Sequence, residues 1–144
     1  LITTTAGANN TRAQALQVSN LSRPPPKPVN MGALDSAATG HFLPENYEGT
    51  NHQSTPNGIR VGCANGSVMR AVATDHLDLR ALPIAARKAH KFRTDEIAIP
   101  LISVPQLCES NMTVLFSKNT VTVKDSTGKQ VLEGKTVSCT SQAV

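Results

Sequence analysis

Short apolar runs separated by turn residues fill the chain after residue 28. One run leads from Val29 into Asp35, and two more, over residues 58–63 and 67–73, flank Ala64-Asn65-Gly66. An Asn-Gly pair between extended runs predicts a β-hairpin, because both positions of such a turn take positive φ. The length and spacing of the runs are typical of strands.

Other strands are expected over residues 76–82, 97–99, 112–116, 120–124 and 130–133. In the first of them, alternation places Leu77, Leu79 and Ala81 on one face. One short helix is expected after Ser103. Ser103 and Gln106 have the spacing of a capping box, and Pro105 falls in the first turn. The pattern therefore predicts a mostly β domain with one short helix.

The two ends of the chain depart from this pattern. Residues 1–28 lack a hydrophobic period and close with a proline-rich run over residues 23–28, so we expect a flexible linker there. The folded domain is expected over residues 29–136, and a polar tail over residues 137–144. Because the chain begins with Leu rather than Met, we expect a fragment or a processed product.

Size and charge narrow the classes of function. The chain has 144 residues, enough for one domain with one core, and carries a formal charge of +4. We interpret its basic cluster, Arg87, Lys88, Lys91 and Arg93, as a solvated loop, so nucleic-acid binding is not expected of this domain; binding by that cluster would be steeply salt-dependent. No apolar run is long enough to span a membrane, so we expect no membrane-spanning segment.

The cysteines and histidines do not predict a cofactor. Cys63, Cys108 and Cys139 have no metal-ligand spacing and cannot all pair within one chain, so free thiols and no metal are expected. His41 follows Asp35 closely, yet no Ser or Cys with its own base completes a nucleophilic triad.

Asp35 and the residues after it are the most informative for chemistry. An apolar strand ends in Asp35, and the hydroxyl of Ser36 and the small residues Ala37, Ala38 and Thr39 follow. Aspartic proteases need an aspartate in a tight turn facing a second one, because two carboxylates about 3 Å apart share one proton. The ionised one activates a water and the protonated one polarises the scissile carbonyl.

The chain offers one such motif. Asp125 is also followed by a serine, but it comes after Lys124 at an expected hairpin turn. An aspartic protease built from this chain would therefore need a second copy, with both Asp35 residues on a two-fold axis. On the residues around Asp35 alone, a turn or helix-capping aspartate is an equal alternative.

Four segments, taken in order, resemble the proteases of copia-type retrotransposons. Residues 34–42 resemble the family's L-D-S-G-A-[ST]-x-H-[MF] opening, and residues 61–67 resemble its V-x-x-A-[DN]-G-S hairpin. Residues 99–108 resemble its N-L-L-S-V-S-Q-L-C segment, and residues 114–135 resemble its closing strands. Each match is weak alone, and the ordered set is specific.

The resemblance implies a homodimeric retropepsin-like subunit, a closed β-barrel with one short helix. It implies that Asp35 is the catalytic acid and base, and that Ser36 bridges the two loops while Ala37 lies beside the substrate backbone. It further implies a flap formed by Cys63, Ala64, Asn65, Gly66 and Ser67, and a turn beneath the active site formed by Leu101, Ile102 and Ser103. The implied substrate is the element's own Gag-Pol polyprotein, cleaved without a cofactor inside cytoplasmic virus-like particles.

Two features depart from the family's pattern: Ala37, and the polar residues 93–96, which stand in place of a longer strand before Ile99. Ala37 stands where the family has glycine, which motivates an alternative: a weak or inactive retropepsin-like domain that serves binding or particle assembly. His41 is expected to have a structural role behind the loop.

Overall fold

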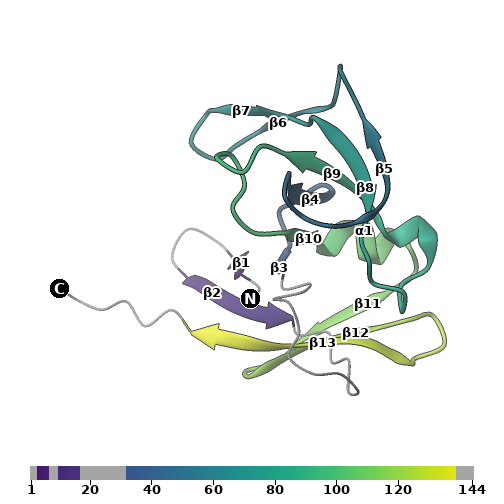
Figure 1. Ribbon diagram of the computed structural model, residues 1–144. Helices are drawn as coiled ribbons and strands as arrows, with labels where there is room; N and C mark the ends of the chain where they lie inside the picture. Colours follow the sequence, from purple (N-terminus) through teal and green to yellow (C-terminus); the bar gives the residue numbers. More distant parts are fainter. Residues whose placement is uncertain (1–2, 7–9, 17–31, 139–144) are drawn as a thin grey trace, which may run out of the picture.

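The computed structural model describes residues 3–6, 10–16 and 32–138, and the side chains of residues 32–135. Its strands form three sheets, shown in Figure 1. A five-stranded antiparallel sheet has the order β1 (Thr3–Ala6), β2 (Asn10–Leu16), β13 (Gln130–Ser138), β12 (Thr120–Lys124) and β11 (Thr113–Phe116).

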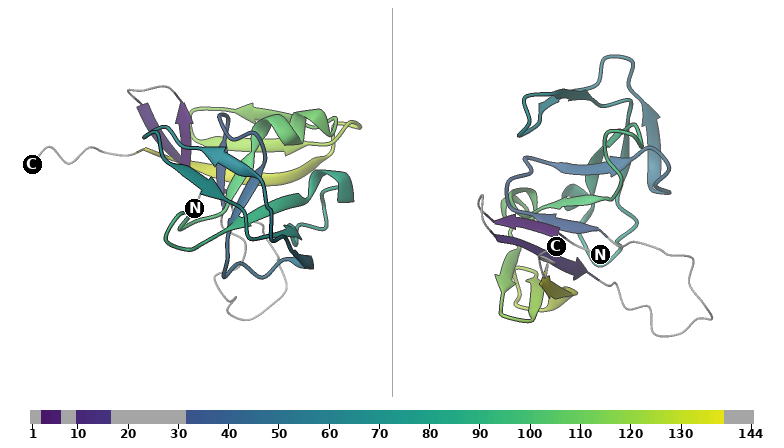
Figure 2. Two further views of the ribbon diagram at one scale, coloured as in Figure 1. Left: turned by 90° about the horizontal axis from the view of Figure 1, so that it is seen from above. Right: turned by 90° about the vertical axis from the view of Figure 1, so that its left-hand side faces the viewer.

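The second sheet has six strands and includes the residues that follow Asp35. Its order is β3 (Ala33–Asp35), β10 (Leu101–Ser103), β4 (His41–Pro44), β9 (Lys88–Phe92), β8 (Ala73–His76) and β5 (Thr50–Ser54). The third is a hairpin of β6 (Arg60–Gly62) and β7 (Val68–Arg70). In Figure 1 and the right-hand view of Figure 2, the six-stranded sheet lies between this hairpin and the five-stranded sheet.

One short α-helix and one 3-10 helix complete the described structure. The helix α1 (Val104–Glu109) follows β10 directly, and the 3-10 helix η1 (Ile84–Ala86) precedes β9. Ser103 is the N-cap of α1, where its side chain accepts a hydrogen bond from the Gln106 N–H, and Pro105 lies in the first turn, as predicted.

The position of β10 is the topological feature that matters most for the site. β3 and β4 are consecutive in sequence, but β10 lies between them, parallel to β3 and antiparallel to β4. The loop over residues 36–40, which joins β3 to β4, therefore crosses over the end of a strand that comes about 60 residues later. That strand braces the loop from below.

Two clusters of buried side chains form the core. The larger one is aliphatic and joins the six-stranded sheet to the five-stranded one through residues such as Leu34, Leu43, Val121, Val123 and Leu132. The smaller one lies under the hairpin and contains Ala38, Phe42, Ala71, Phe92 and Ile97. Phe42 and Phe92 meet edge to face with ring centroids 5.2 Å apart, a favourable geometry for an aromatic pair.

The predicted mostly β composition with one short helix is confirmed, whereas the closed barrel is wrong for the described strands. Closure requires the two end strands of a sheet to pair. The five-stranded sheet instead ends at β1 and β11, and the six-stranded sheet ends at β3 and β5.

Two of the expected strands are also wrong. Residues 77–82 and 97–99 form bends and turns. Leu77 and Leu79 are nevertheless buried as the alternation predicted, while Ala81 is exposed and Leu82 is buried in its place. Burial can alternate along a segment even where no neighbouring strand is available for a continuous ladder.

The basic cluster is not a solvated loop, because Lys88–Phe92 is an inner strand of the six-stranded sheet. At the ends of the chain, the expected 1–28 linker contains β1 and β2, and β13 extends into the expected tail as far as Ser138. The proline-rich run over residues 23–28 and residues 139–144, including Cys139, lie outside the described residues. Cys63 and Cys108 are free thiols.

Candidate active site

The loop after β3 presents a carboxylate at its surface. Asp35 is the last residue of β3 and is half-buried, whereas Ser36, Ala37 and Thr39 are exposed. The Ala37 N–H donates a hydrogen bond of 2.8 Å to Asp35 Oδ1, which fixes the carboxylate relative to its own loop. Ala38 turns back into the core, so the loop is anchored behind its exposed tip.

Ser103 braces this loop from the strand beneath it. The parallel register of β10 and β3 pairs Leu101 with Ala33, Ile102 with Leu34 and Ser103 with Asp35. Ser103 is fully buried; its Oγ donates to the Ala38 carbonyl at 2.6 Å and accepts from the Gln106 N–H at 3.1 Å. One hydroxyl therefore holds the loop and begins the helix.

His41 forms the other side of the brace. Its Nδ1 accepts a hydrogen bond from the Ser103 N–H at 2.9 Å, and its Nε2 lies 2.7 Å from the Ala86 carbonyl. Since a carbonyl can only accept, the ring is the neutral tautomer with the proton on Nε2. Burial lowers the pKa of His41 from 6.5 to about 4, although the Ala86 carbonyl acts in the opposite direction. With both ring nitrogens engaged, the geometry supports a structural role.

Gln106 does not complete the capping box. Its Oε1 accepts from the His41 N–H at 2.9 Å, and its Nε2 donates to the Lys88 carbonyl at 2.8 Å. The side chain thus joins the helix to β4 and β9 instead of returning to the N-cap residue. The spacing of Ser103 and Gln106 correctly predicted where the helix begins. The contacts of the Gln106 amide with residues 41 and 88 could not be predicted from neighbouring residues.

The hairpin expected to be a flap forms between β6 and β7. The Gly66 N–H donates to the Cys63 carbonyl at 3.0 Å, and the Cys63 N–H donates to the Ser67 carbonyl at 2.8 Å. Among the described residues of this turn only Gly66 has positive φ, at 83°, so the expectation for Asn65 is wrong. The geometry is a turn followed by one left-handed glycine. Asn65 Oδ1 accepts from both the N–H and the hydroxyl of Ser67, and it stabilises the tip.

The inner face of the hairpin rests on the core beside the Asp35 loop. Val61 and Met69 pack against the cluster that contains Ala38 and Phe42. Gly58, at the base, allows a close approach: a Cβ there would overlap the carbonyl oxygen of Ala71. Ala64, Asn65, Gly66 and Ser67 are exposed and Cys63 is half-buried.

Asp125 is a turn residue in the other sheet, as its sequence context predicted. Its Oδ1 accepts hydrogen bonds from the Thr127 N–H, the Thr127 hydroxyl and the Lys129 N–H. The Thr127 hydroxyl bond is the main reason that the pKa of Asp125 is lowered. A carboxylate committed to three local donors closes its hairpin.

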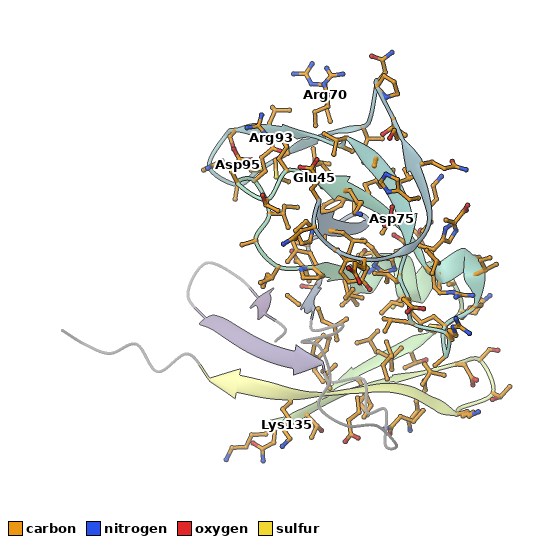
Figure 3. The ribbon with its side chains drawn as sticks, in the orientation of Figure 1. Glu45, Arg70, Asp75, Arg93, Asp95 and Lys135 are labelled. Carbon is orange, nitrogen blue, oxygen red and sulfur yellow. The ribbon has the colours of Figure 1, made fainter. Side chains whose placement is uncertain are left out.

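A charged group that the sequence pattern did not predict lies inside the six-stranded sheet. Asp75 is 1% exposed; its Oδ2 lies 3.0 Å from Lys91 Nζ, and its Oδ1 lies 2.6 Å from His52 Nδ1. Figure 3 shows Asp75 among the strands of this sheet. The signal was available, because Asp75 lies in phase with the buried Ala73, Leu77 and Leu79. An aspartate at an inward position predicts a buried partner.

Comparisons with known proteins return nothing for this chain: no family model, curated protein or solved structure matches it. In the described residues, no group of three or more His, Cys, Asp or Glu side chains is placed to hold a metal ion. No helix in the same part of the chain is long and apolar enough to span a bilayer.

Proposed function

We propose that the chain is one subunit of a homodimeric, retropepsin-like aspartic endopeptidase, in which Asp35 of each copy supplies half of the catalytic pair. The observation that carries this proposal is the geometry of one loop. Asp35 ends a buried strand with its carboxylate fixed by the Ala37 N–H, while Ser36 and Ala37 lie exposed beside it. A second copy can therefore approach this tip without unfolding anything.

The bracing of the loop supports a catalytic role over a simple turn. Ser103, His41 and Gln106 come from three elements and hold the loop and its return strand by buried or half-buried hydrogen bonds. A turn aspartate such as Asp125 needs only local donors. A catalytic carboxylate has to be held in place by several elements, because a small displacement of it lowers the reaction rate strongly.

In the proposed reaction the two Asp35 carboxylates share one proton and bind a water between them. The ionised carboxylate takes a proton from that water as it attacks the scissile carbonyl, and the protonated one donates a hydrogen bond to the carbonyl oxygen. The proton taken from the water then passes to the leaving nitrogen, so the pair is again singly protonated after each turnover.

Ala37 is compatible with this mechanism. Its φ is not positive, because Asn51 and Asn111 are the non-glycine residues with positive φ in the described part of the chain. Its bond to Asp35 uses the backbone N–H, which alanine retains, and its side chain is exposed. Replacement of the family's glycine therefore introduces no backbone strain in the loop.

The hairpin supports the same proposal as a cover for an extended peptide. Its inner face packs beside the loop, and its tip is exposed. An extended substrate between hairpin and loop would add main-chain hydrogen bonds like an extra strand. By the four-segment resemblance, we extend the proposal to processing of the element's own Gag-Pol polyprotein inside cytoplasmic virus-like particles.

The decisive comparison is between Asp35→Asn and Asp125→Asn, the same chemical change in the catalytic loop and in a hairpin turn. Asp35→Asn should abolish cleavage of an unfolded polypeptide substrate while the protein remains folded and dimeric by light scattering. Asp125→Asn should retain cleavage. Cleavage that survives Asp35→Asn would refute the proposal.

Mixing the two forms tests whether both copies contribute. Random exchange of wild-type and Asp35→Asn subunits in equal amounts should leave about a quarter of the dimers with two aspartates, and activity should fall accordingly. A fall to one half would mean that each subunit works alone. A folded dimer that neither cleaves nor binds a peptide-like inhibitor at any pH would favour the binding or assembly alternative.

A further inference from the structure

The outer face of the β6–β7 hairpin carries charge that the proposed reaction does not use. We define this hairpin outer face by Arg60, Gly62, Val68 and Arg70, all of them exposed, while Val61 and Met69 face the core. Alternation along two short strands separates the faces in this way. Figure 3 shows Arg70 at the outer margin of the molecule, remote from Lys135 on the five-stranded sheet.

The strand register places the two arginines directly opposite each other. Arg60 pairs with Arg70, and Gly62 pairs with Val68. The Ala71 N–H donates to the Ile59 carbonyl and the Cys63 N–H donates to the Ser67 carbonyl, so the pairs that exchange hydrogen bonds are 59 with 71 and 63 with 67. Arg60 and Arg70 therefore form a non-hydrogen-bonded pair, the closer kind, with Cα atoms about 4.5 Å apart.

Nothing in the described structure neutralises this pair. The ion pairs involve Asp75, Asp78 and Asp95, and none of them includes Arg60 or Arg70 among the described residues. Asp95 is held by Arg93 at 2.8 Å. Like charges directly opposite on one face of a sheet are destabilising, so the arrangement costs stability unless an anion lies between the two guanidinium groups.

We propose that the hairpin outer face binds the phosphodiester backbone of a nucleic acid, with Arg60 and Arg70 gripping adjacent phosphates. Guanidinium groups bind phosphate oxygens in a bidentate manner, and two of them on a narrow ridge suit a chain of regularly spaced anions. This surface is separate from the basic cluster considered in the sequence, in which Lys91 is buried and paired with Asp75. The inference does not depend on proteolysis.

A nucleic acid fits this surface better than an acidic peptide. The hairpin has no aromatic residue between positions 60 and 70, and its outer face offers only Gly62 and Val68 besides the arginines. A ridge with so few side chains cannot read a peptide sequence or stack on bases. It can contact a backbone without regard to sequence, and the chain's charge of +4 favours a polyanion.

The test is binding of fluorescently labelled single-stranded DNA, measured by anisotropy at several salt concentrations. The variants are Arg60→Ser with Arg70→Ser, and a control that removes two exposed charges on the five-stranded sheet, Lys118→Ser with Lys135→Ser. Two phosphate contacts on single-stranded DNA predict a salt slope of about 1.4, so the affinity should fall about sevenfold between 50 and 200 mM salt. The double arginine variant should bind weakly with a salt slope near zero, and the control should bind like wild type.

A charge-retaining variant, Arg60→Lys with Arg70→Lys, keeps the test valid if the serine variant unfolds, and it should retain the salt slope. The proposal is overturned if the arginine and control variants weaken binding equally, or if the lysine variant loses the slope as well. It is also overturned if a polyglutamate peptide of matched charge binds more tightly than the DNA, since carboxylates would then be the preferred partner.

Discussion

His41 should make the protein lose stability in mild acid. The pKa of its imidazole is lowered by burial from 6.5 to about 4, so between these values the unfolded chain binds a proton that the folded protein does not. The contribution of the neutral His41 imidazole to the free energy of unfolding is fully present above pH 6.5. It declines by about 1.4 kcal/mol per pH unit as the pH falls below that value. Below about pH 4 both states are protonated and the loss levels off at about 3 kcal/mol.

Structure explains why protonation is resisted. A second ring proton would point Nδ1–H at the Ser103 N–H, which replaces a hydrogen bond of 2.9 Å with a repulsive contact inside the core. That contact lies next to the Ser103 hydroxyl, which holds the Asp35 loop. Acid should therefore loosen the loop before the rest of the sheet.

The measurement is urea unfolding followed by far-ultraviolet circular dichroism from pH 7 to pH 4, because the chain has no Trp and one Tyr. The comparison variant is His41→Gln, whose side chain does not titrate. It should be less stable than wild type at pH 7, and the difference between the two proteins should shrink by about 3 kcal/mol by pH 4. Since burial also lowers the pKa of His90, only this difference isolates His41.

Two results would refute the reasoning. Parallel stability curves for wild type and His41→Gln between pH 6.5 and 4 would show that the imidazole is not held neutral by the fold. An NMR titration that gives the His41 imidazole a pKa near 6.5 in the folded protein would contradict the hydrogen-bond assignment directly. A spectrum that shows the proton of the neutral ring on Nδ1 would do the same.

Three substitutions, two of them compared with a control substitution, test other parts of the structure by urea unfolding. Asp75→Asn should lower the free energy of unfolding by about 3 kcal/mol, because it leaves the buried Lys91 without its counter-charge. Asp78→Asn, at a side chain that is 43% exposed, should lower it little. Equal losses in the two variants would mean that the buried pair is unimportant. Gly58→Ala should cost about 2 kcal/mol or more and raise hydrogen exchange in β6 and β7, because the new Cβ meets a backbone carbonyl. Gly62→Ala has open space at the Cβ and should change stability by less than about 1 kcal/mol; a similar loss at both glycines would contradict this explanation. Ser103→Ala should cost about 2 kcal/mol, since it removes a helix cap and a buried hydrogen bond, and an unchanged midpoint would show that the hydroxyl does not brace the loop.

Features with a local cause could be predicted from sequence. The cap at Ser103 is predictable because capping depends on residues three apart. The strands predicted over residues 112–116 and 120–124 match β11 and β12, because each is a short apolar run bounded by turn residues. Asp35 was found for the same reason, as the end of an apolar run. Each signal is contained within about seven residues.

Features that depend on distant partners were missed. β9 (Lys88–Phe92) is polar enough to suggest a loop, yet it is an inner strand because β4 and β8 bond to both of its edges and Asp75 neutralises Lys91. β5 is exposed along its whole length and exists only by pairing with β8. The double use of Gln106 and the locked tautomer of His41 likewise need partners 18 to 65 residues away.

The insertion of β10 between β3 and β4 has a consequence for synthesis. Asp35 and its loop leave the ribosome well before Ser103, which is 65 residues beyond Ala38. At translation rates of about 5–20 residues per second, roughly 3 to 13 seconds pass before the strand that organises the loop is available. During that interval the nascent chain carries the Asp35 carboxylate on a loop that Ser103 has not yet braced. If the chain is the protease proposed above, the order of synthesis would delay its cutting of the polyprotein in which it is made.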